Sequence, residues 1–338
     1  MTRMATACFL TPYSRVKLHS EHLEVFDHSE KGAVENRLAE VPLEGLDRII
    51  VSEQVSITIP AIAALARRNV PVHFLDSLGH ALADCLPVSP PAGETRLAQY
   101  AAASNPGLAL PFSRALVLAK LANQYRVVQR LELNRPRGLE TDLVSLREFQ
   151  DTATATGEVA ALRGVEGAGS ALFFRLWAQF LPEAFPFERR SRRPPHNPVN
   201  ACLSFGATLL YQEIRTALHV AGLDTALGFL HVSEDGRHAL ALDVMEPFRP
   251  VVPEALTLRL FNLGLLSDDH FEPSHGGIYL NTAGRRVFLQ QYEQRLTREF
   301  TSEHVGHRTT LRQQFRDTAL SLKAALHEPA LFRPFRLN

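Results

Sequence analysis

A proline-rich stretch at residues 87–93 divides this chain into two segments of different character. The stretch reads Pro-Val-Ser-Pro-Pro-Ala-Gly. Each proline fixes φ and lacks a backbone N–H, so neither a helix nor a central strand can run through the stretch. The chain has 338 residues, which is enough to bury two cores. We therefore predict a domain at 1–86, a linker at 87–93 and a second domain at 94–338.

The segment before the linker has short runs in which apolar and polar residues alternate, the pattern of half-buried β-strands. Residues 59–68 form a short helical run, and residues 70–75 form a compact apolar strand that we expect to be buried. The other predicted strands, which we assign to an antiparallel sheet, are 15–18, 22–26, 37–41 and 48–51. This segment is predicted to be a small β-rich domain.

After the linker, apolar residues recur at spacings of three and four, which is typical of helices that bury one face. The predicted helices are 112–133, 141–155, 158–180, 198–221, 254–263, 285–300 and 307–326. The predicted fold class is therefore α+β, with a small β-rich N-terminal domain followed by a larger, nearly all-α domain.

The formal net charge is zero, which is not what a simple basic nucleic-acid coat would show. The basic residues are unevenly placed, however. A dense basic cluster comprises Arg189, Arg190, Arg192 and Arg193. Such a cluster can attract phosphate even when the whole molecule is neutral, although many charge runs are only solvated surface.

The three cysteines, Cys8, Cys85 and Cys202, are scattered and form no C-x-x-C pair. This argues against a disulfide framework and a thiolate zinc site, and it suits a reducing cytoplasm. No stretch approaches the roughly 20 apolar residues that span a bilayer. We expect a soluble protein that is not exported and has no membrane segment.

Glu166 is the first candidate for chemistry. It is surrounded by Gly164, Gly167 and Gly169, although glycine in a helix costs about 1 kcal/mol relative to alanine. Small neighbours permit another backbone, or a ligand, to approach closely. The alternative is close helix packing with Glu166 paired to an arginine such as Arg163.

His231, Asp243 and Glu246 are further candidates. His231 closes an apolar run before a turn, where a histidine is often only a satisfied, partly buried side chain. Asp243 and Glu246 have the spacing of a capping box at a helix start, and the same spacing projects two carboxylates to one side. A histidine with several carboxylate oxygens suits Mg²⁺ or Mn²⁺. Spacing does not prove this combination, because Glu166 lies far earlier in the chain.

Several segments together closely resemble the CRISPR-associated integrase family that acquires new spacers. The segments that carry the resemblance are 197–206, 210–215, 222–224, 227–231 and 240–250, with supporting matches at 55–60, 70–75, 120–124, 162–167 and 277–281. The resemblance spans essentially the whole chain. Two departures are Phe173, where the family often has tyrosine, and Ala207, where it often has an aromatic residue.

The resemblance implies a β-rich N-terminal domain used for dimerisation and an α-helical catalytic domain. It also implies that Mg²⁺ or Mn²⁺ is held by Glu166, His231 and Glu246. Asp243 is expected beside the metal, as an occasional ligand or hydrogen-bonded behind the ligands. The expected location is the cytoplasm of a prokaryote.

The implied reaction is a transesterification on double-stranded DNA. The 3′-hydroxyl of a foreign DNA fragment attacks a phosphodiester at the boundary of a CRISPR repeat, which demands mainly positioning and charge stabilisation from the protein. Two strand ends require a homodimer at least, and the family adds a small bridging partner protein. The DNA-contact candidates are Arg189, Arg190, Arg192, Arg193, Tyr211 and Arg215.

Two alternatives stay open. The first is a structure-specific, metal-dependent nuclease that cleaves branched DNA by water attack and does not integrate. The second is a non-catalytic DNA scaffold, for which replacement of the three predicted metal ligands would leave DNA processing unchanged.

Overall fold

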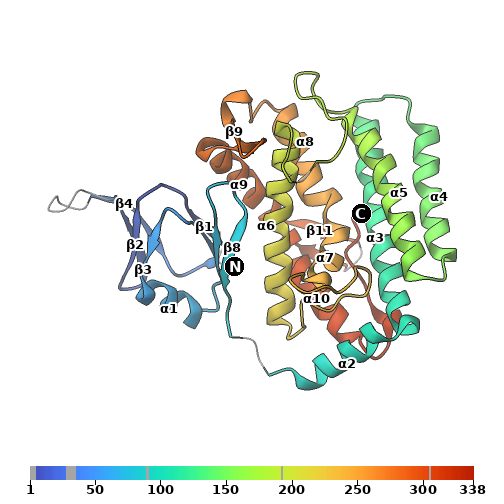
Figure 1. Ribbon diagram of the computed structural model, residues 1–338, viewed down its shortest axis with the longest axis horizontal. Helices are drawn as coiled ribbons and strands as arrows, with labels where there is room; N and C mark the ends of the chain where they lie inside the picture. The colour runs from blue at the N-terminus through green and yellow to red at the C-terminus, as the bar shows by residue number, and fades with distance from the viewer. Residues whose placement is uncertain (1–4, 28–35, 89–90, 192, 304–305) are drawn as a thin grey trace.

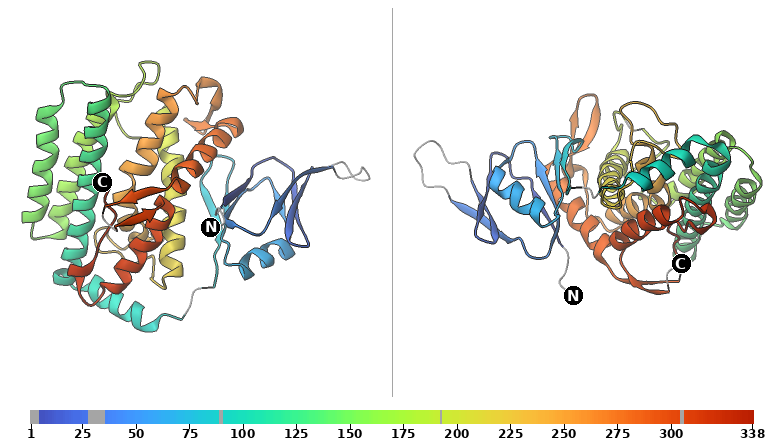
Figure 2. Two further views of the ribbon diagram at one scale, coloured as in Figure 1. Left: turned by 180° about the vertical axis from the view of Figure 1, so that it is seen from behind. Right: turned by 90° about the horizontal axis from the view of Figure 1, so that it is seen from below.

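The computed structural model describes residues 5–27, 36–88, 91–191, 193–303 and 306–338. A β-rich N-terminal part lies beside a larger helical part (Figure 1), and the two further views show the same division (Figure 2). The predicted α+β fold class is confirmed. No helix in the described part of the chain is long and apolar enough to cross a membrane.

The described residues of the N-terminal part form two four-stranded sheets and one helix, α1 (Ile59–Arg67). The first sheet has the order β1 (Ala5–Phe9), β5 (Leu46–Ser52), β7 (Val72–Leu75) and β8 (Ala81–Cys85). The second has the order β4 (Arg37–Pro42), β3 (His22–Phe26), β2 (Arg15–His19) and β6 (Ser56–Ile57).

The prediction of one antiparallel sheet is wrong for part of this domain. Strands β2, β3 and β4 pair antiparallel as predicted, but β5 pairs in parallel with both β1 and β7. Strand β5 lies inside the first sheet, between β1 and β7. Its residues Ile49, Ile50 and Val51 are all buried, and a strand covered on both faces reads as a continuous apolar run, as central parallel strands do.

In the helical part, an α-helix overlaps each of the seven predicted stretches, although two of these helices begin several residues earlier than predicted, at Pro106 and Thr282. The α-helices of this part are α2 (Gly93–Ser104), α3 (Pro106–Asn134), α4 (Glu140–Ala155), α5 (Val159–Ala178), α6 (Pro198–Val220), α7 (Ala239–Met245), α8 (Ala255–Asn262), α9 (Thr282–Thr297) and α10 (Leu311–Ala324). The short turns η1 (Glu246–Phe248) and η2 (Pro250–Glu254) join α7 to α8. The long helix α3 packs against α4 and α5.

Two short hairpins interrupt the helices, so this part is less purely helical than predicted. They pair β9 (Phe271–Ser274) with β10 (Gly277–Leu280), and β11 (Phe300–Ser302) with β12 (His307–Thr309). Residues 307–309 were predicted to start a helix. The helix begins later because the Thr310 side chain accepts a hydrogen bond from Gln313 N (3.1 Å), which caps α10.

The position of Phe173 explains why this chain can have phenylalanine where the resembled family often has tyrosine. Its side chain on α5 is fully buried and packs in the large apolar cluster of the helical part. A tyrosine hydroxyl at this depth would need a hydrogen-bond partner to offset its desolvation. Phenylalanine avoids that need.

Strand β5 joins the two parts of the molecule. Alternate side chains point to opposite faces of a strand, so Ile49 and Val51 enter the core of the β-rich part while Ile50 belongs to the core of the helical part. Arg48, on the same side as Ile50, is 2% exposed and forms an ion pair with Glu213 of α6. The domain interface therefore combines apolar packing with buried charge.

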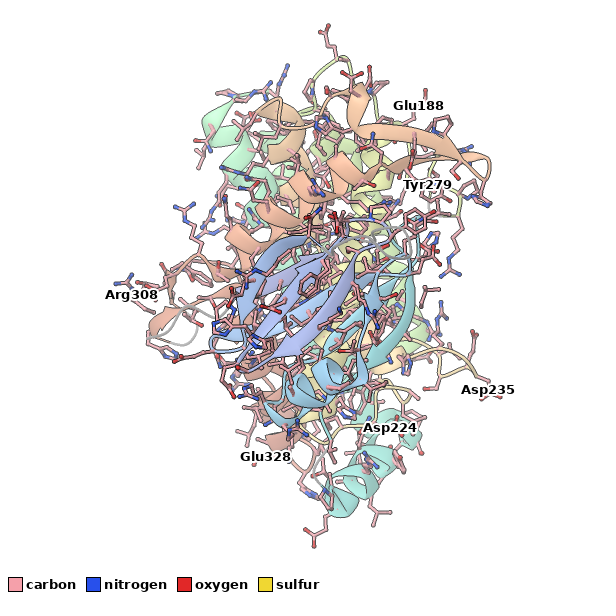
Figure 3. All side chains as sticks on the ribbon, turned by 90° about the vertical axis from the view of Figure 1, so that its left-hand side faces the viewer. Glu188, Asp224, Asp235, Tyr279, Arg308 and Glu328 are labelled. Carbon is pink, nitrogen blue, oxygen red and sulfur yellow. The ribbon has the colours of Figure 1, made fainter. Side chains whose placement is uncertain are left out.

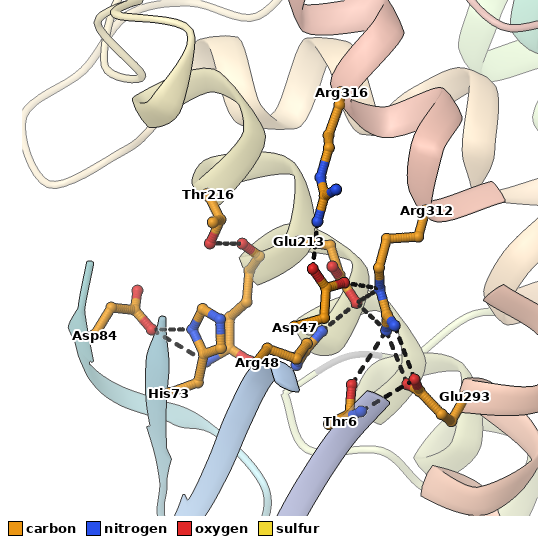
Figure 4. Close-up of polar contacts among 11 residues, drawn as sticks. Thr6, Asp47, Arg48, His73, Asp84, Glu213, Thr216, Glu293, Arg312 and Arg316 are labelled. Carbon is orange, nitrogen blue, oxygen red and sulfur yellow. Dashed lines mark hydrogen bonds and ion pairs between the residues drawn. The ribbon is translucent and has the colours of Figure 1, made fainter. Parts of the chain in front are cut away.

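A network of buried charges extends from this pair (Figure 4). Arg312 of α10 binds Glu213 (2.9 Å), Glu293 of α9 (2.8 Å) and Asp47 of β5 (3.2 Å). Burial alone would raise the pKa of Glu213, but the charges of Arg312 and Arg48 lower that pKa to about 2. Strand β5 and helices α6, α9 and α10 are thus held together by paired charges.

We expect Glu213→Gln to lower the free energy of unfolding by about 3–5 kcal/mol, because two buried guanidiniums lose their shared anion. Urea denaturation followed by the fluorescence of Trp177 measures this. The folded pKa is depressed, so the contribution of Glu213 is present above its unfolded pKa of about 4.3 and is lost as the pH falls toward 2.

The matched control is Glu299→Gln, which removes a charge from the exposed ion pair with Arg308. An exposed pair contributes about 0–1 kcal/mol. Equal losses of stability in Glu213→Gln and Glu299→Gln would contradict the structural role of the buried network.

Candidate functional site

A large cavity of about 1680 Å³, called here the main cavity, opens among α5, α6, α7 and the β9–β10 hairpin. Glu188 and Tyr279, which line it, lie on one side of the molecule (Figure 3). Of the residues predicted from the sequence, the cavity is lined by Glu166, His231, Glu246, Arg189, Arg190, Arg193, Tyr211 and Arg215. Arg192 lies outside the described residues.

Two carboxylates from distant parts of the chain meet on one cation at this cavity. The ammonium of Lys120, on α3, forms ion pairs with Glu166 Oε1 of α5 and with Glu246 Oε2 at the start of η1. The Lys120 side chain is 5% exposed, whereas that of Glu166 is 22% exposed. The site therefore has a buried floor and an accessible carboxylate.

The sequence did not identify Lys120 as a site residue. A signal was present, because lysine is almost never fully buried unless it is paired, and Lys120 interrupts an otherwise apolar stretch of α3. On the same helix, Asn123 donates to the carbonyl of Pro247 (2.7 Å), which ties α3 to the turn that carries Glu246.

The surroundings of Glu166 contradict one part of the sequence-based alternatives, its predicted arginine partner. Arg163 donates to the carbonyl of Leu230 (3.0 Å), so the suggested pairing of Glu166 with Arg163 is wrong. Of the three glycines, only Gly169 is at a close helix contact, where an added Cβ would lie 2.5 Å from Leu121 of α3. Ser170 donates to Glu166 Oε1 (2.9 Å) and helps to orient that carboxylate.

Asp243 is not the N-cap of a helix. It lies within α7, while Glu246 begins η1, so the capping-box alternative is wrong. Asp243 is fully buried, and its carboxylate accepts hydrogen bonds from the backbone N–H groups of Phe229 (2.6 Å), Leu230 (2.9 Å) and His231 (2.8 Å). Gly228 permits this wrapping, since an added Cβ would lie 2.6 Å from Asp243 Oδ2.

The same carboxylate orients the imidazole of His231. Nδ1 of His231 lies 2.7 Å from Asp243 Oδ1, which leaves Nε2 free to meet a ligand in the cavity. Burial alone would lower the pKa of His231. The hydrogen bond to Asp243, together with the charges of Asp243, Glu246 and Glu166, raises that pKa above its ordinary value.

Glu246 lies in a compact group of alternating charges. Besides Lys120, it contacts Arg249 Nη1 (3.2 Å), and Arg249 Nε in turn lies 3.5 Å from Glu254. Although burial would raise it, the pKa of Glu246 is lowered to about 2 by Lys120 and Arg249. This carboxylate is therefore ionised at neutral pH and available to a cation.

The donor set suits a hard divalent ion, because carboxylate oxygens and one imidazole nitrogen face the same cavity. Among the described residues, no group of three or more His, Cys, Asp or Glu side chains is already gathered as a metal cage. The cation that Glu166 and Glu246 share here is the ammonium of Lys120. The assignment of Glu166, His231 and Glu246 as metal ligands stays a prediction.

Two of the predicted DNA-contact side chains are already hydrogen-bonded to other residues of the protein. Arg190 donates to Asn200 Oδ1 (2.9 Å) and Ser204 Oγ (3.0 Å) and so anchors its loop on α6. Arg215 donates to Asp84 of β8 (2.7 Å), and its guanidinium lies 5.6 Å from the ring centre of Tyr211. These arginines line the cavity and also hold neighbouring elements together, and their role toward DNA stays a prediction.

The family match and the two relatives described below all point to the same protein family. Residues 8–294 match the family described as CRISPR associated protein Cas1. A CRISPR-associated endonuclease Cas1 of Thermus thermophilus is 36% identical over 302 residues, which cover 89% of this chain and 91% of that protein. A Cas4/Cas1 exonuclease–endonuclease fusion of Rhodospirillum rubrum is 35% identical over 277 residues, covering 80% of this chain but only 48% of the fusion.

Solved structures share the fold. A CAS1 protein from Thermotoga maritima superposes with a TM-score of 0.81 at 24% identity, covering 96% of this chain and 97% of that one. A casposase bound to its integration product gives a TM-score of 0.83 at 22% identity, covering 96% of this chain and 90% of that one. At these identities the likeness establishes the architecture.

We expect Asp243→Asn to lower the pKa of His231, because an amide supplies no negative charge to its Nδ1–H. The pH titration of the His231 ring signals by NMR, with a chelator present, measures this. The raised pKa means that the charged imidazole stabilises the fold below its unfolded pKa of about 6.5, and that this contribution is lost as the pH rises through the folded value.

Asp142→Asn, on the surface helix α4, serves as the control and should leave the titration of His231 unchanged. An unaltered His231 titration in Asp243→Asn would show that Asp243 does not set the charge of the imidazole.

Proposed function

This chain belongs to the Cas1 family of CRISPR-associated endonucleases, and we propose that it inserts foreign DNA fragments into a CRISPR array by metal-dependent transesterification. The observation that carries the proposal is the meeting of Glu166 and Glu246 on one buried cation at the main cavity. Two carboxylates at a cavity with arginines on its walls suit a reaction on phosphodiesters.

Glu166, His231 and Glu246 are the proposed ligands of Mg²⁺ or Mn²⁺. When bound, the metal would polarise the scissile phosphate and stabilise the charge that develops on its oxygens. Asp243 fixes the His231 ring so that Nε2 faces the cavity. Lys120 keeps the two carboxylates from repelling each other before a divalent cation arrives.

The reaction exchanges one phosphodiester for another. The 3′-oxygen of the incoming strand forms a bond to phosphorus, the bond from that phosphorus to the leaving oxygen of the repeat breaks, and one proton moves from the attacking to the leaving hydroxyl. No oxidant, reductant or nucleotide is consumed. The proposed task of the protein is to align the two oxygens and exclude water.

Arg189 and Arg193 are proposed to hold backbone phosphates at the cavity wall. The proposed substrates are the foreign double-stranded fragment and the repeat DNA. Because two strand ends react, the functional unit is proposed to be a homodimer formed through the β-rich domain, assembled with a small bridging protein.

We expect Glu166→Gln, His231→Ala and Glu246→Gln each to lower the rate of DNA joining about 100-fold or more, while DNA binding is largely retained. The assay supplies a fragment with free 3′-hydroxyls and a supercoiled plasmid that bears a repeat, and it quantifies joined product. Glu148→Gln, an exposed glutamate on α4, is the matched control.

The same assay separates the alternatives. Nicking of the plasmid without joined product would favour the structure-specific nuclease and refute integration. Unchanged processing in all three variants would favour the DNA scaffold and refute catalysis at this site.

We expect Mn²⁺ at about 100 times its Kd to stabilise the wild-type chain by about 2.7 kcal/mol against unfolding, since it binds only the folded state. Glu246→Gln should lose most of this gain, whereas Glu148→Gln should keep it. Thermal unfolding with Mn²⁺ or with a chelator measures both, and it needs no DNA.

Lys120→Gln provides a second thermal test. Without metal it should be less stable than the wild type, because two carboxylates lose their cation. Added Mn²⁺ should then stabilise Lys120→Gln more than it stabilises the wild type. Equal stabilisation of wild type, Lys120→Gln and Glu246→Gln would refute a metal at this position.

A further inference from the structure

A second cavity, called here the arginine cavity, lies among α3, α8, α9 and the β11 strand and has a volume of about 380 Å³. Its charged lining consists of Arg130, Arg259, Arg295 and Arg298, and no Asp or Glu side chain is among the described residues that line it. The net charge of the whole chain is zero, so four arginine side chains in one small cavity are a strong local excess of positive charge, even where a main-chain oxygen of Asn338 offsets Arg130.

The arginine cavity is separate from the main cavity, with which it shares no lining residue. Arg308 of β12, the strand that pairs with β11, lies on the opposite side of the molecule from Tyr279, which lines the main cavity (Figure 3). A ligand in the arginine cavity would therefore not contact Glu166 or Glu246.

The four guanidiniums are held or presented in different ways. Arg295 donates through Nε to the carbonyl of Val251, and Arg130 donates to a main-chain oxygen of Asn338, the last residue of the sequence (2.8 Å). Within the part of the chain that the structure describes, the side chains of Arg259 and Arg298 have no hydrogen-bond or ion-pair partner. Both are exposed at the cavity and free to bind an anion.

Helix polarity alone does not explain this convergence. Arg259 and Arg295 lie in the last turns of α8 and α9, where a cation gains about 0.3–1 kcal/mol from the helix dipole. This stabilisation acts at each helix end separately, so it does not require the ends of α8 and α9 to lie close together. Burial, and then the charges of Arg259, Arg298 and Arg130, lower the pKa of Arg295 to about 10, so the four cations repel one another when no anion lies between them.

We propose that the arginine cavity binds a ligand that carries at least two phosphate groups. The planar guanidinium fork matches phosphate oxygens in bidentate fashion. A single phosphate carries a charge of about −1.5 to −2 at neutral pH, which leaves four arginines incompletely neutralised. The volume falls within the range of roughly 300–1,000 Å³ for small-ligand pockets, so the phosphates are held compactly.

Two sources can supply this chemistry: a free polyphosphate, such as the tail of a nucleotide, or consecutive phosphates of a nucleic-acid backbone. Both present clustered phosphate oxygens to the same four side chains. The proposal does not rest on the integrase reaction, because binding here involves neither Glu166 nor Glu246.

The test is isothermal titration calorimetry of the full chain with tripolyphosphate in a buffer containing a chelator. We expect saturable binding to the wild type that the double variant Arg259→Gln/Arg298→Gln weakens about tenfold or more, since each lost charge-assisted contact is strong. Both residues are exposed and unpaired in the described structure, so the variant should fold, which circular dichroism checks.

The matched control is Arg67→Gln/Arg96→Gln, which removes two exposed arginines on α1 and α2 that line neither cavity. It should bind tripolyphosphate as the wild type does, and so should Glu166→Gln. If the wild type binds tripolyphosphate but joins no DNA, the result counts against the proposed function alone.

Competition identifies the source of the phosphates. Displacement of tripolyphosphate by a short duplex without terminal phosphates assigns the arginine cavity to a nucleic-acid backbone, and absence of displacement assigns it to a free polyphosphate. The proposal is overturned if tripolyphosphate does not bind the wild type or binds the double variant equally well. It is also overturned if only a polyglutamate peptide binds in an arginine-dependent way, which would indicate an acidic protein partner.

Discussion

The ammonium of Lys120 is the interaction on which the site depends. It is buried between Glu166 and Glu246, which come from α5 and η1. Two carboxylates facing each other in a partly desolvated place would repel strongly without a cation between them. Three elements, α3, α5 and η1, therefore meet around one positive charge, and that charge also lowers the pKa of Glu246. The site is organised for a cation, whichever cation occupies it.

Helix α6 connects this site to the β-rich domain. Glu213 on α6 binds Arg48 of β5 and Arg312 of α10, while Arg215, two residues further along α6, binds Asp84 of β8. The face of α6 that lines the main cavity is thus fixed by strands of the other domain. Because the paired charges are buried, a change in domain orientation would leave them unpaired at a large energetic cost.

Periodicity and turn chemistry predicted much of the architecture. Alternation located β2 and β3, and three-to-four spacing located seven helices. Local rules failed where partners in space decide the outcome. The spacing of Asp243 and Glu246 fits a capping box, but Asp243 is instead inside α7, where three backbone N–H groups of a loop bind it. The antiparallel assignment of β5 failed because pairing direction depends on neighbours, β1 and β7, that adjacent sequence does not reveal.

By itself the sequence determined the α+β class and the residue types able to hold a hard cation, while the domain division at the prolines of 87–93 stays a prediction. Only the tertiary structure brought Lys120 to Glu246, which is 126 residues away along the chain, and gave Glu166 that lysine as its partner instead of Arg163. It also decided that Asp243 orients His231 from behind. The physical reason is that periodicity describes which face of an element is apolar, whereas the pairing of buried charges depends on how distant elements pack.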